Sequence, residues 1–195
     1  MTHRNTIPHF SGTLGVIPKG YVLIPIPGSK TLWTKGLAMN PSEGRDVTGF
    51  LEYRVARLEE IIGLREEVLI KGTDRVSPEF QGDRNPTTLH FGAFHQGRAV
   101  GCLTFLLNEW QGEPAWQLRG MATDAAFRGK GIGRHLLRFA ENHLLHVSPV
   151  RRLWCNARSG AAGFYEKLSW RRESDEFLIE GVGPHYKMSK TLAKR

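Results

Sequence analysis

Residues 118–133 read LRGMATDAAFRGKGIG, a strand-like run that leads through a short turn into a glycine-rich segment. A helical pattern follows from residue 131 to about residue 146, and its polar residues, Glu141 among them, fall away from the apolar face. That face consists of Ile132, Leu136, Leu137, Ala140 and Leu144. A glycine-rich turn between a strand and a helix leaves backbone N–H groups free at the positive end of the helix dipole. The stretch therefore predicts an anion site that suits phosphates.

Two common phosphate-binding motifs are excluded by the spacing of this segment. A Walker loop would need glycine at position 124 and serine or threonine at position 131, where the chain has Asp124 and Gly131. A dinucleotide fingerprint that starts at Gly129 would need its third glycine at Arg134. The motif that remains is Arg128, two residues, Gly131, one residue and Gly133.

The rest of the chain alternates strand and helix patterns from about Tyr53 onward. Strands are expected at 53–58, 90–94, 99–107, 116–123, 153–157, 176–179 and 186–189, with a turn at Gln96-Gly97. Helices are expected at 59–70, at 131–146 and after Ser159, which is a plausible N-cap. This order predicts an α/β (α+β) domain with a mixed, mostly antiparallel central sheet and helices on both faces.

Residues 1–50 form a different region, rich in glycine and proline and without sustained helical periodicity. We interpret them as an N-terminal extension to a catalytic domain at 51–195. A flexible arm, an irregular coil packed on the domain and translation from an upstream start codon remain open as explanations for this region.

Composition limits the class of protein. The 195 residues suffice for one domain with a hydrophobic core, and no apolar run approaches the roughly 20 residues that span a bilayer. With no apolar signal-peptide core, we expect a cytoplasmic protein without membrane contact. Cys102 and Cys155 lie in apolar runs without metal-ligand spacing, which predicts buried thiols and no metal site.

The net charge of +8 favours polyanionic partners without distinguishing RNA from coenzyme A. One basic cluster surrounds the glycines and suits phosphates; its members are Arg128, Lys130, Arg134 and Arg138. A second cluster forms a tail, expected to be solvated, with Lys187, Lys190, Lys194 and Arg195.

The glycine motif resembles the signature of the GCN5-related N-acetyltransferase (GNAT) family: glutamine or arginine, two residues, glycine, one residue, glycine or alanine. Residues 118–123 resemble the family's fourth strand, 156–158 the end of its fifth strand, and 163–168 the short helix that carries its tyrosine. These matches follow the family's order between about Tyr53 and Leu192. One departure is Ser169, where members usually have a glycine that ends this helix in a left-handed conformation.

The resemblance implies the GNAT acyltransferase fold and acetyl-coenzyme A as acetyl donor, without a metal. Divergence of the fourth and fifth strands would leave a slot for pantetheine, and the backbone amides of 129–134 would hold the pyrophosphate. The residues implied at the donor site are Met121, Ala122, Thr123, Arg128, Gly129, Lys130, Gly131, Ile132, Gly133, Arg134, Asn156 and Phe164. The side chains of Lys130 and Arg134 either add charge or are solvated, and Asn156 either bonds the donor or only ends its strand.

Tyr165 is implied as the catalytic general acid that protonates the leaving thiolate.

The acceptor is an amine, expected on a small molecule, and nucleic acid is not excluded as a partner. The general base is open among His90, Glu109, His185 and a water, while Arg119 meets either an acceptor carboxylate or an acid at the core edge. The protein is expected as a monomer or homodimer. The alternatives are a noncatalytic acyl-coenzyme A-binding regulatory protein and a basic RNA-binding module.

Overall fold

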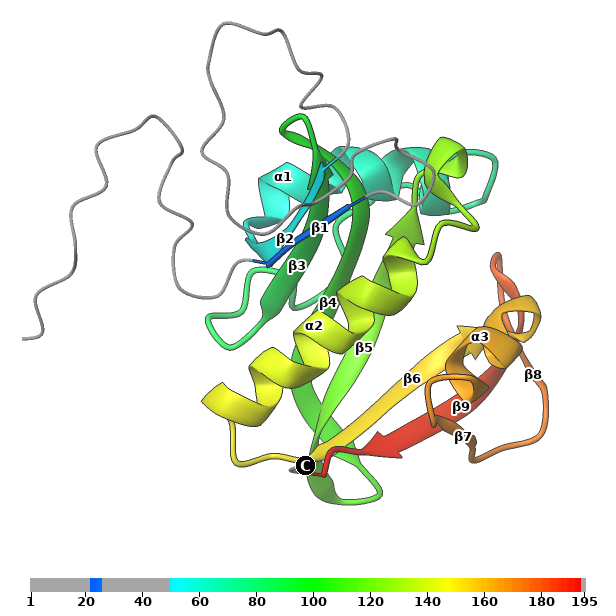
Figure 1. The fold of residues 1–195 in the computed structure, drawn as a ribbon. Coiled ribbons are helices and arrows are strands. Elements are labelled where there is room, and N and C mark those ends of the chain that lie inside the picture. The colour runs from blue at the N-terminus through cyan, green and yellow to red at the C-terminus, as the bar shows by residue number, and fades with distance from the viewer. Residues whose placement is uncertain (1–21, 26–49, 194–195) are drawn as a thin grey trace, which may run out of the picture.

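The computed structural model describes residues 22–25 and 50–193, which build a nine-stranded sheet with helices on both of its faces (Figure 1). The strands are β1 (Val22–Pro25), β2 (Phe50–Ala56), β3 (Leu89–His95), β4 (Arg98–Trp110), β5 (Glu113–Thr123), β6 (Arg152–Arg158), β7 (Arg171–Arg172), β8 (Phe177–Ile179) and β9 (Gly183–Thr191). The helices are α1 (Leu58–Arg65), α2 (Ile132–Val147) and α3 (Ala162–Glu166), with a π-helical turn η2 (Glu66–Ile70) and 3-10 turns η3 (Ala125–Phe127) and η4 (Ser159–Ala161).

The strand order is β1-β2-β3-β4-β5-β6-β9-β7, and β8 pairs with β9. Every pairing is antiparallel except that of β5 with β6, which pair in parallel only at Trp116 with Leu153 and at Gln117 with Trp154. Beyond these residues the two strands separate into a V that opens toward α3 (Figure 1). The predicted mixed, mostly antiparallel sheet is confirmed, and the opening of the V determines where the site lies.

Two apolar clusters hold α1 and α2 on opposite faces of the sheet. On the α2 face, Phe91 packs in one cluster with Leu136 and Leu137. On the α1 face, Phe94 and Cys102 pack in the other cluster with Ile61. Side chains alternate across a strand, so neighbours such as Phe91 and Phe94 reach different faces. The prediction of buried cysteines is confirmed, because Cys102 and Cys155 are both free and buried.

Two expected elements differ from the observed ones near the start of the domain. The first strand of the domain is β2, which begins at Phe50 rather than Tyr53 and pairs with β1, a strand inside the expected extension. The helix expected at 59–70 is α-helical only to Arg65 and continues as the π-helical turn η2. Of the expected 1–50 extension, residues 1–21 and 26–49 lie outside the described residues.

Further differences from expectation concern individual polar residues. Ser159 does not cap a helix, because its hydroxyl donates to Glu176 at 2.6 Å. Glu141 is buried, because its carboxylate accepts from the Trp170 indole at 3.0 Å and from Lys190 at 2.6 Å. The basic tail expected to be solvated is thus partly structural, and its last two residues lie outside the described part of the chain. Ser169 has the left-handed φ of 65° expected after α3.

Candidate functional site

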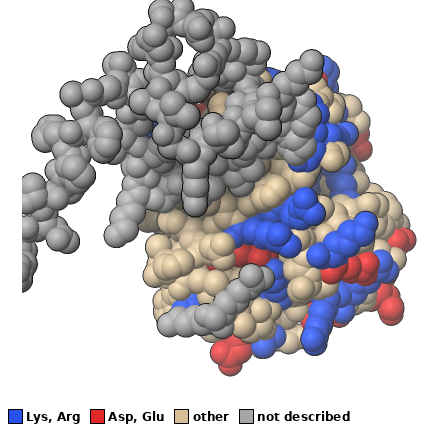
Figure 2. Space-filling view, viewed as in Figure 1, with Lys and Arg blue, Asp and Glu red and all other residues tan. Residues whose placement is uncertain are grey.

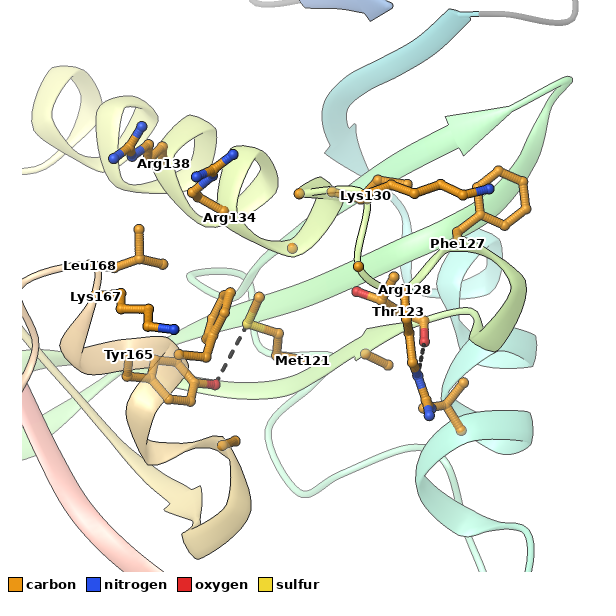
Figure 3. A pocket seen from close by; sticks show the side chains of 18 residues that line it. Met121, Thr123, Phe127, Arg128, Lys130, Arg134, Arg138, Tyr165, Lys167 and Leu168 are labelled. Carbon is orange, nitrogen blue, oxygen red and sulfur yellow. Dashed lines mark hydrogen bonds between the residues drawn. The ribbon is translucent and has the colours of Figure 1, made fainter. Parts of the chain in front are cut away.

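A cavity of about 900 Å³ lies where β5, the start of α2 and α3 meet (Figure 3). It is lined by Val68, Met121, Ala122, Thr123, Phe127, Arg128, Gly129, Lys130, Gly131, Ile132, Gly133, Arg134, Arg138, Ala161, Phe164, Tyr165, Lys167 and Leu168. We call it the first cavity. It gathers every residue implied for the donor site except Asn156, together with Tyr165. Arg138, which follows Arg134 by one helical turn, was predicted only as part of the basic cluster that suits phosphates, and Lys167 was not predicted.

Backbone geometry makes the glycine turn open to a ligand. Gly129 and Gly131 have φ values of 75° and 78°, which residues with a Cβ rarely adopt. Gly131 is the N-cap of α2, and its carbonyl accepts the N–H of His135 at 3.0 Å. The N–H groups of the first helical turn have no intrahelical acceptor. A Cβ on Gly133 would approach Met121 Cε to 3.2 Å, so a side chain there would enter the cavity wall.

Among the described residues, every charged side chain that lines the first cavity is positive. Its charged lining residues, all within the described part of the chain, are Arg128, Lys130, Arg134, Arg138 and Lys167. Figure 2 shows Lys and Arg side chains gathered over α2 and toward α3. Lys130 extends along Phe127, with Nζ 5.1 Å from the ring centre. Arginines and free N–H groups at a helix start are the groups that bind phosphate, so the cavity fits a polyphosphate ligand.

Tyr165 points across the first cavity to Met121 at the opening of the V (Figure 3). Its hydroxyl donates to Met121 Sδ at 3.6 Å, and the residue is 8% exposed. Burial raises the pKa of Tyr165 well above its usual value, and the neighbouring Cys155 thiol raises it further. The hydroxyl therefore keeps its proton at neutral pH and has one to donate.

A second cavity of about 740 Å³ adjoins the first. Its walls come from η2, from the loop that follows it, from β5, from the end of β6 and from β9. Five residues line both cavities: Val68, Met121, Arg128, Ala161 and Tyr165. Asn156, implied for the donor site, lines only this second cavity, as do Arg119 and His185.

The three candidate bases occupy very different places. Both ring nitrogens of His90 are engaged, Nδ1 with the Thr104 hydroxyl at 2.7 Å and Nε2 with the Asp83 carbonyl at 3.0 Å. Burial lowers the pKa of His90, and the residue lines neither cavity. Glu109 is exposed at the far end of β4, opposite Pro114. Only His185 lines the second cavity.

A buried ion network fixes the loop beside the second cavity. The Asp83 carboxylate accepts from Arg65 at 2.5 Å, from Arg119 at 2.9 Å and from the Phe80 N–H at 2.8 Å. Burial would raise the pKa of Asp83, but the Phe80 N–H and the two guanidinium groups hold it below its usual value. Of the two alternatives for Arg119, pairing with an acid at the core edge is the one observed.

Gly120 makes room for this network at a bulge in β5. Cys102 pairs with Ala122 and Thr104 with Arg119, so Gly120 and Met121 together stand opposite one residue of β4. Gly120 has a φ of 59°, and a Cβ there would lie 2.8 Å from Arg65 Nε. The bulge therefore both admits the buried Arg65 and shifts Met121 toward the junction of the two cavities.

Within residues 22–25 and 50–193, no group of three or more His, Cys, Asp or Glu side chains is arranged to hold a metal ion. The helices of the same residues include none that is long and apolar enough to cross a membrane.

Comparisons with known proteins agree with this geometry. The family model "Acetyltransferase (GNAT) family" matches residues 56–170. An uncharacterized N-acetyltransferase of Bacillus subtilis (strain 168), YitI, is 33% identical over 148 residues, which cover 73% of this chain and 97% of that protein.

Solved structures share the fold at lower identity. An acyl-CoA N-acyltransferase from Pseudomonas aeruginosa has a TM-score of 0.62 at 17% identity, covering 71% of this chain and 99% of that one. An aminoglycoside 6'-N-acetyltransferase complexed with coenzyme A has a TM-score of 0.54 at 14% identity, covering 70% and 91%. The chain belongs to the GNAT family of acetyl-coenzyme A-dependent N-acetyltransferases.

Proposed function

We propose that the protein binds acetyl-coenzyme A in the first cavity and transfers its acetyl group directly to an amine held in the second. The observation that carries this proposal is the junction of the two cavities. Met121 and Tyr165 line both of them at the place where β5 and β6 separate. A donor thioester and an acceptor amine placed on either side of these residues would meet without a covalent enzyme intermediate.

Donor binding would use main-chain atoms first and side-chain charge second. The N–H groups of residues 129–134 would bind the pyrophosphate, and Arg134, Arg138 and Lys167, which line the cavity, would add positive charge around it. The backbone around Met121 and Ala122, at the bulge of β5, would donate to the thioester oxygen as it gains negative charge. The pantetheine arm would lie in the open V, where β5 offers a strand edge.

Acetyl transfer replaces the carbon–sulfur bond of the thioester with a carbon–nitrogen bond, and a proton is exchanged at the nitrogen and at the sulfur. The amine nitrogen forms a bond to the acetyl carbon, the carbon–sulfur bond breaks, and the nitrogen loses a proton. Tyr165 would donate its hydroxyl proton to the departing sulfur, which gives the free thiol, and the tyrosinate would regain a proton from solvent before the next turnover. Its position on the wall shared by the two cavities supports this role.

The acceptor amine needs a base, because a lysine-like amine with a pKa of about 10.4 is protonated at neutral pH. We propose His185 for this role. Its Nδ1 lies 2.8 Å from the Gly183 carbonyl, which requires an N–H at Nδ1 and leaves the Nε2 lone pair available. The cavity wall position of His185 supports the assignment over His90, whose two nitrogens are both engaged.

A noncatalytic acyl-coenzyme A-binding protein is less well supported, since such a protein has no use for an acceptor cavity that adjoins the donor site. The test incubates the protein with acetyl-coenzyme A and a panel of amines, amino acids and peptides. Release of free thiol would be followed, and the acetylated product identified by mass. We expect amine-dependent thiol release. Tight acetyl-coenzyme A binding without transfer to any amine would contradict the proposal.

A further inference from the structure

The second cavity has an unusual excess of arginine. Four arginines line it: Arg75, Arg119, Arg128 and Arg158. Two acids line it as well, Asp74 and Glu79. The question is which of these charges are already neutralised by partners within the protein, because only the remainder is available to a ligand.

Two of the six charged groups are in ion pairs, a third has a structural hydrogen bond, and a fourth, Asp74, is an exposed carboxylate without an ion pair among the described residues. Arg119 is held by the buried Asp83 carboxylate. Glu79 accepts two hydrogen bonds from Arg84, at 2.6 and 2.7 Å. Arg128 donates from Nε to the Thr123 carbonyl and faces both cavities. The arginines that remain for a ligand of the second cavity alone are Arg75 and Arg158.

Arg75 and Arg158 form no ion pair with any carboxylate of residues 22–25 and 50–193. They come from distant parts of the chain, the loop after η2 and the end of β6. Burial lowers the pKa of the Arg75 guanidinium, and the positive charge of Arg158 lowers it further. Both arginines line the second cavity, where their like charges repel each other, and an anion bound beside them would relieve this repulsion.

We infer that Arg75 and Arg158 bind a carboxylate of the acceptor, so that the acceptor is an amine that also carries an acid group, as amino acids and peptide ends do. The inference rests on the proposed function, since it assigns the substrate class of the same site. Guanidinium groups bind carboxylates through paired hydrogen bonds, which gives orientation as well as affinity. His185, opposite Arg158 in the pairing of β6 with β9, lies beside this anion site.

The same charges disfavour other acceptors. A polyamine or another polycation would place additional positive charge next to Arg75, Arg158 and Arg128. Among the described residues of the cavity wall, the one carboxylate outside an ion pair is Asp74, which is exposed to solvent. Specificity of this kind comes from repulsion of the wrong ligand as much as from attraction of the right one. The site therefore distinguishes amines by the charge of the rest of the molecule.

The test compares matched acceptors on matched variants. Free amino acids would be compared with their carboxamides, which keep the amine and lose the negative charge. Phosphoethanolamine, ethanolamine and a diamine would complete the panel. The variants are Arg75→Gln and Arg158→Gln. The control is Arg152→Gln, which makes the same change at the opposite end of β6, outside both cavities.

In the unmodified protein we expect kcat/KM to be about 10- to 100-fold higher for amino acids than for their carboxamides, the range of a charge-assisted hydrogen bond. That ratio should fall toward one in Arg75→Gln and Arg158→Gln and stay unchanged in Arg152→Gln. Acetyl-coenzyme A affinity, measured by calorimetry, should be the same in all four proteins, which also reports that they are folded.

Several outcomes would overturn the inference. Equal transfer to amino acids and carboxamides would show that Arg75 and Arg158 bind no acceptor carboxylate. A preference for amino acids that survives both substitutions would show the same. If the protein prefers phosphoethanolamine and the variants lose that preference, the arginines bind a phosphate rather than a carboxylate. Transfer only to neutral or cationic amines rejects the acid-bearing acceptor and leaves the proposed function intact. Absence of transfer to every amine rejects the proposed function itself.

Discussion

The two cavities are built in opposite ways. The first is formed largely by one continuous stretch, from Met121 to Arg138, whose glycines expose main-chain N–H groups. The second is assembled from η2, a loop, β5, β6 and β9, and a buried ion network holds its loop in place. Under the proposed function, the donor that the family shares would be bound by backbone that local sequence specifies. The acceptor would be bound by side chains that only tertiary packing brings together.

The largest effect is expected at the glycine turn. Gly133→Val should abolish detectable acetyl-coenzyme A binding, because its side chain would meet Met121 and Thr123 in the cavity wall. Gly131→Val should do the same, and adds the strain of a positive φ. Gly160→Val is the control, since a Cβ there meets nothing within 4 Å. Calorimetric titration decides this, and wild-type affinity in a folded Gly133→Val protein would show that the donor site lies elsewhere.

The next effect concerns the junction of the cavities. Tyr165→Phe keeps the ring and deletes only the proton donor, and general acid catalysis contributes about 100- to 10,000-fold to a rate. We expect a single-turnover rate lower by at least about 100-fold, with acetyl-coenzyme A affinity nearly unchanged. If the variant transfers acetyl at the wild-type rate across the pH range, Tyr165 only packs against Met121 and the general-acid role must be withdrawn.

The third prediction concerns the buried ion network around Asp83, which should affect the second cavity but not the first. Asp83→Ala leaves Arg65 buried without its partner, which costs about 3–5 kcal/mol of unfolding free energy. Glu67→Ala, which breaks an exposed pair with Lys71, should cost less than about 1 kcal/mol. Urea unfolding measures both. In the Asp83 variant we also expect a higher KM for the acceptor and an unchanged affinity for acetyl-coenzyme A. Equal losses at both cavities would contradict the division of roles.

A smaller effect is expected on folding stability at low pH, through Glu60 on the α1 face outside both cavities. Hydrogen bonds from Arg54 lower the pKa of Glu60 from 4.5 to about 2. Because the folded-state pKa is the lower one, Glu60 contributes stability that is fully present above about pH 4.5 and is lost as the pH falls toward 2. In Glu60→Gln, stability should decline less steeply over this window. Identical profiles of stability against pH for the two proteins would show that ionised Glu60 does not stabilise the fold.

The smallest effect is expected from removing residues 1–49. Among the described residues, those that line the two cavities all lie at Val68 or later, so acetyl-coenzyme A affinity should not change. The deletion also removes β1, which leaves β2 as an unpaired edge strand and makes association between copies the main hazard. Calorimetry and size-exclusion chromatography would test this. An unfolded or nonbinding product would show that the domain needs its N-terminal residues.

Local patterns predicted much of the fold and most of the first cavity. The strand-like runs of β3 and β4, the turn at Gln96-Gly97 and the apolar stripe of α2 are all features that short sequence windows determine. The spacing of Arg128, Gly131 and Gly133 sufficed to identify the glycine turn. Lys167 was missed because its place in the cavity depends on how α3 packs, which no periodicity encodes.

The second cavity could not be predicted in the same way. Asp83 lies in a polar loop, and nothing in its neighbourhood signals a carboxylate buried against Arg65 and Arg119. His90 and His185 looked equivalent in the sequence, and only the three-dimensional structure separates a histidine with both nitrogens engaged from one on a cavity wall. Glu141 was assigned to the polar face because its partners, Trp170 and Lys190, are distant in sequence.

The most direct test of this division is a crystal structure of the protein with coenzyme A bound. We predict a pyrophosphate against the N–H groups of residues 129–134, the pantetheine between β5 and β6, and the sulfur beside the Tyr165 hydroxyl, with the second cavity left open for an amine. Coenzyme A seated in the second cavity, or a sulfur remote from Tyr165, would contradict the account.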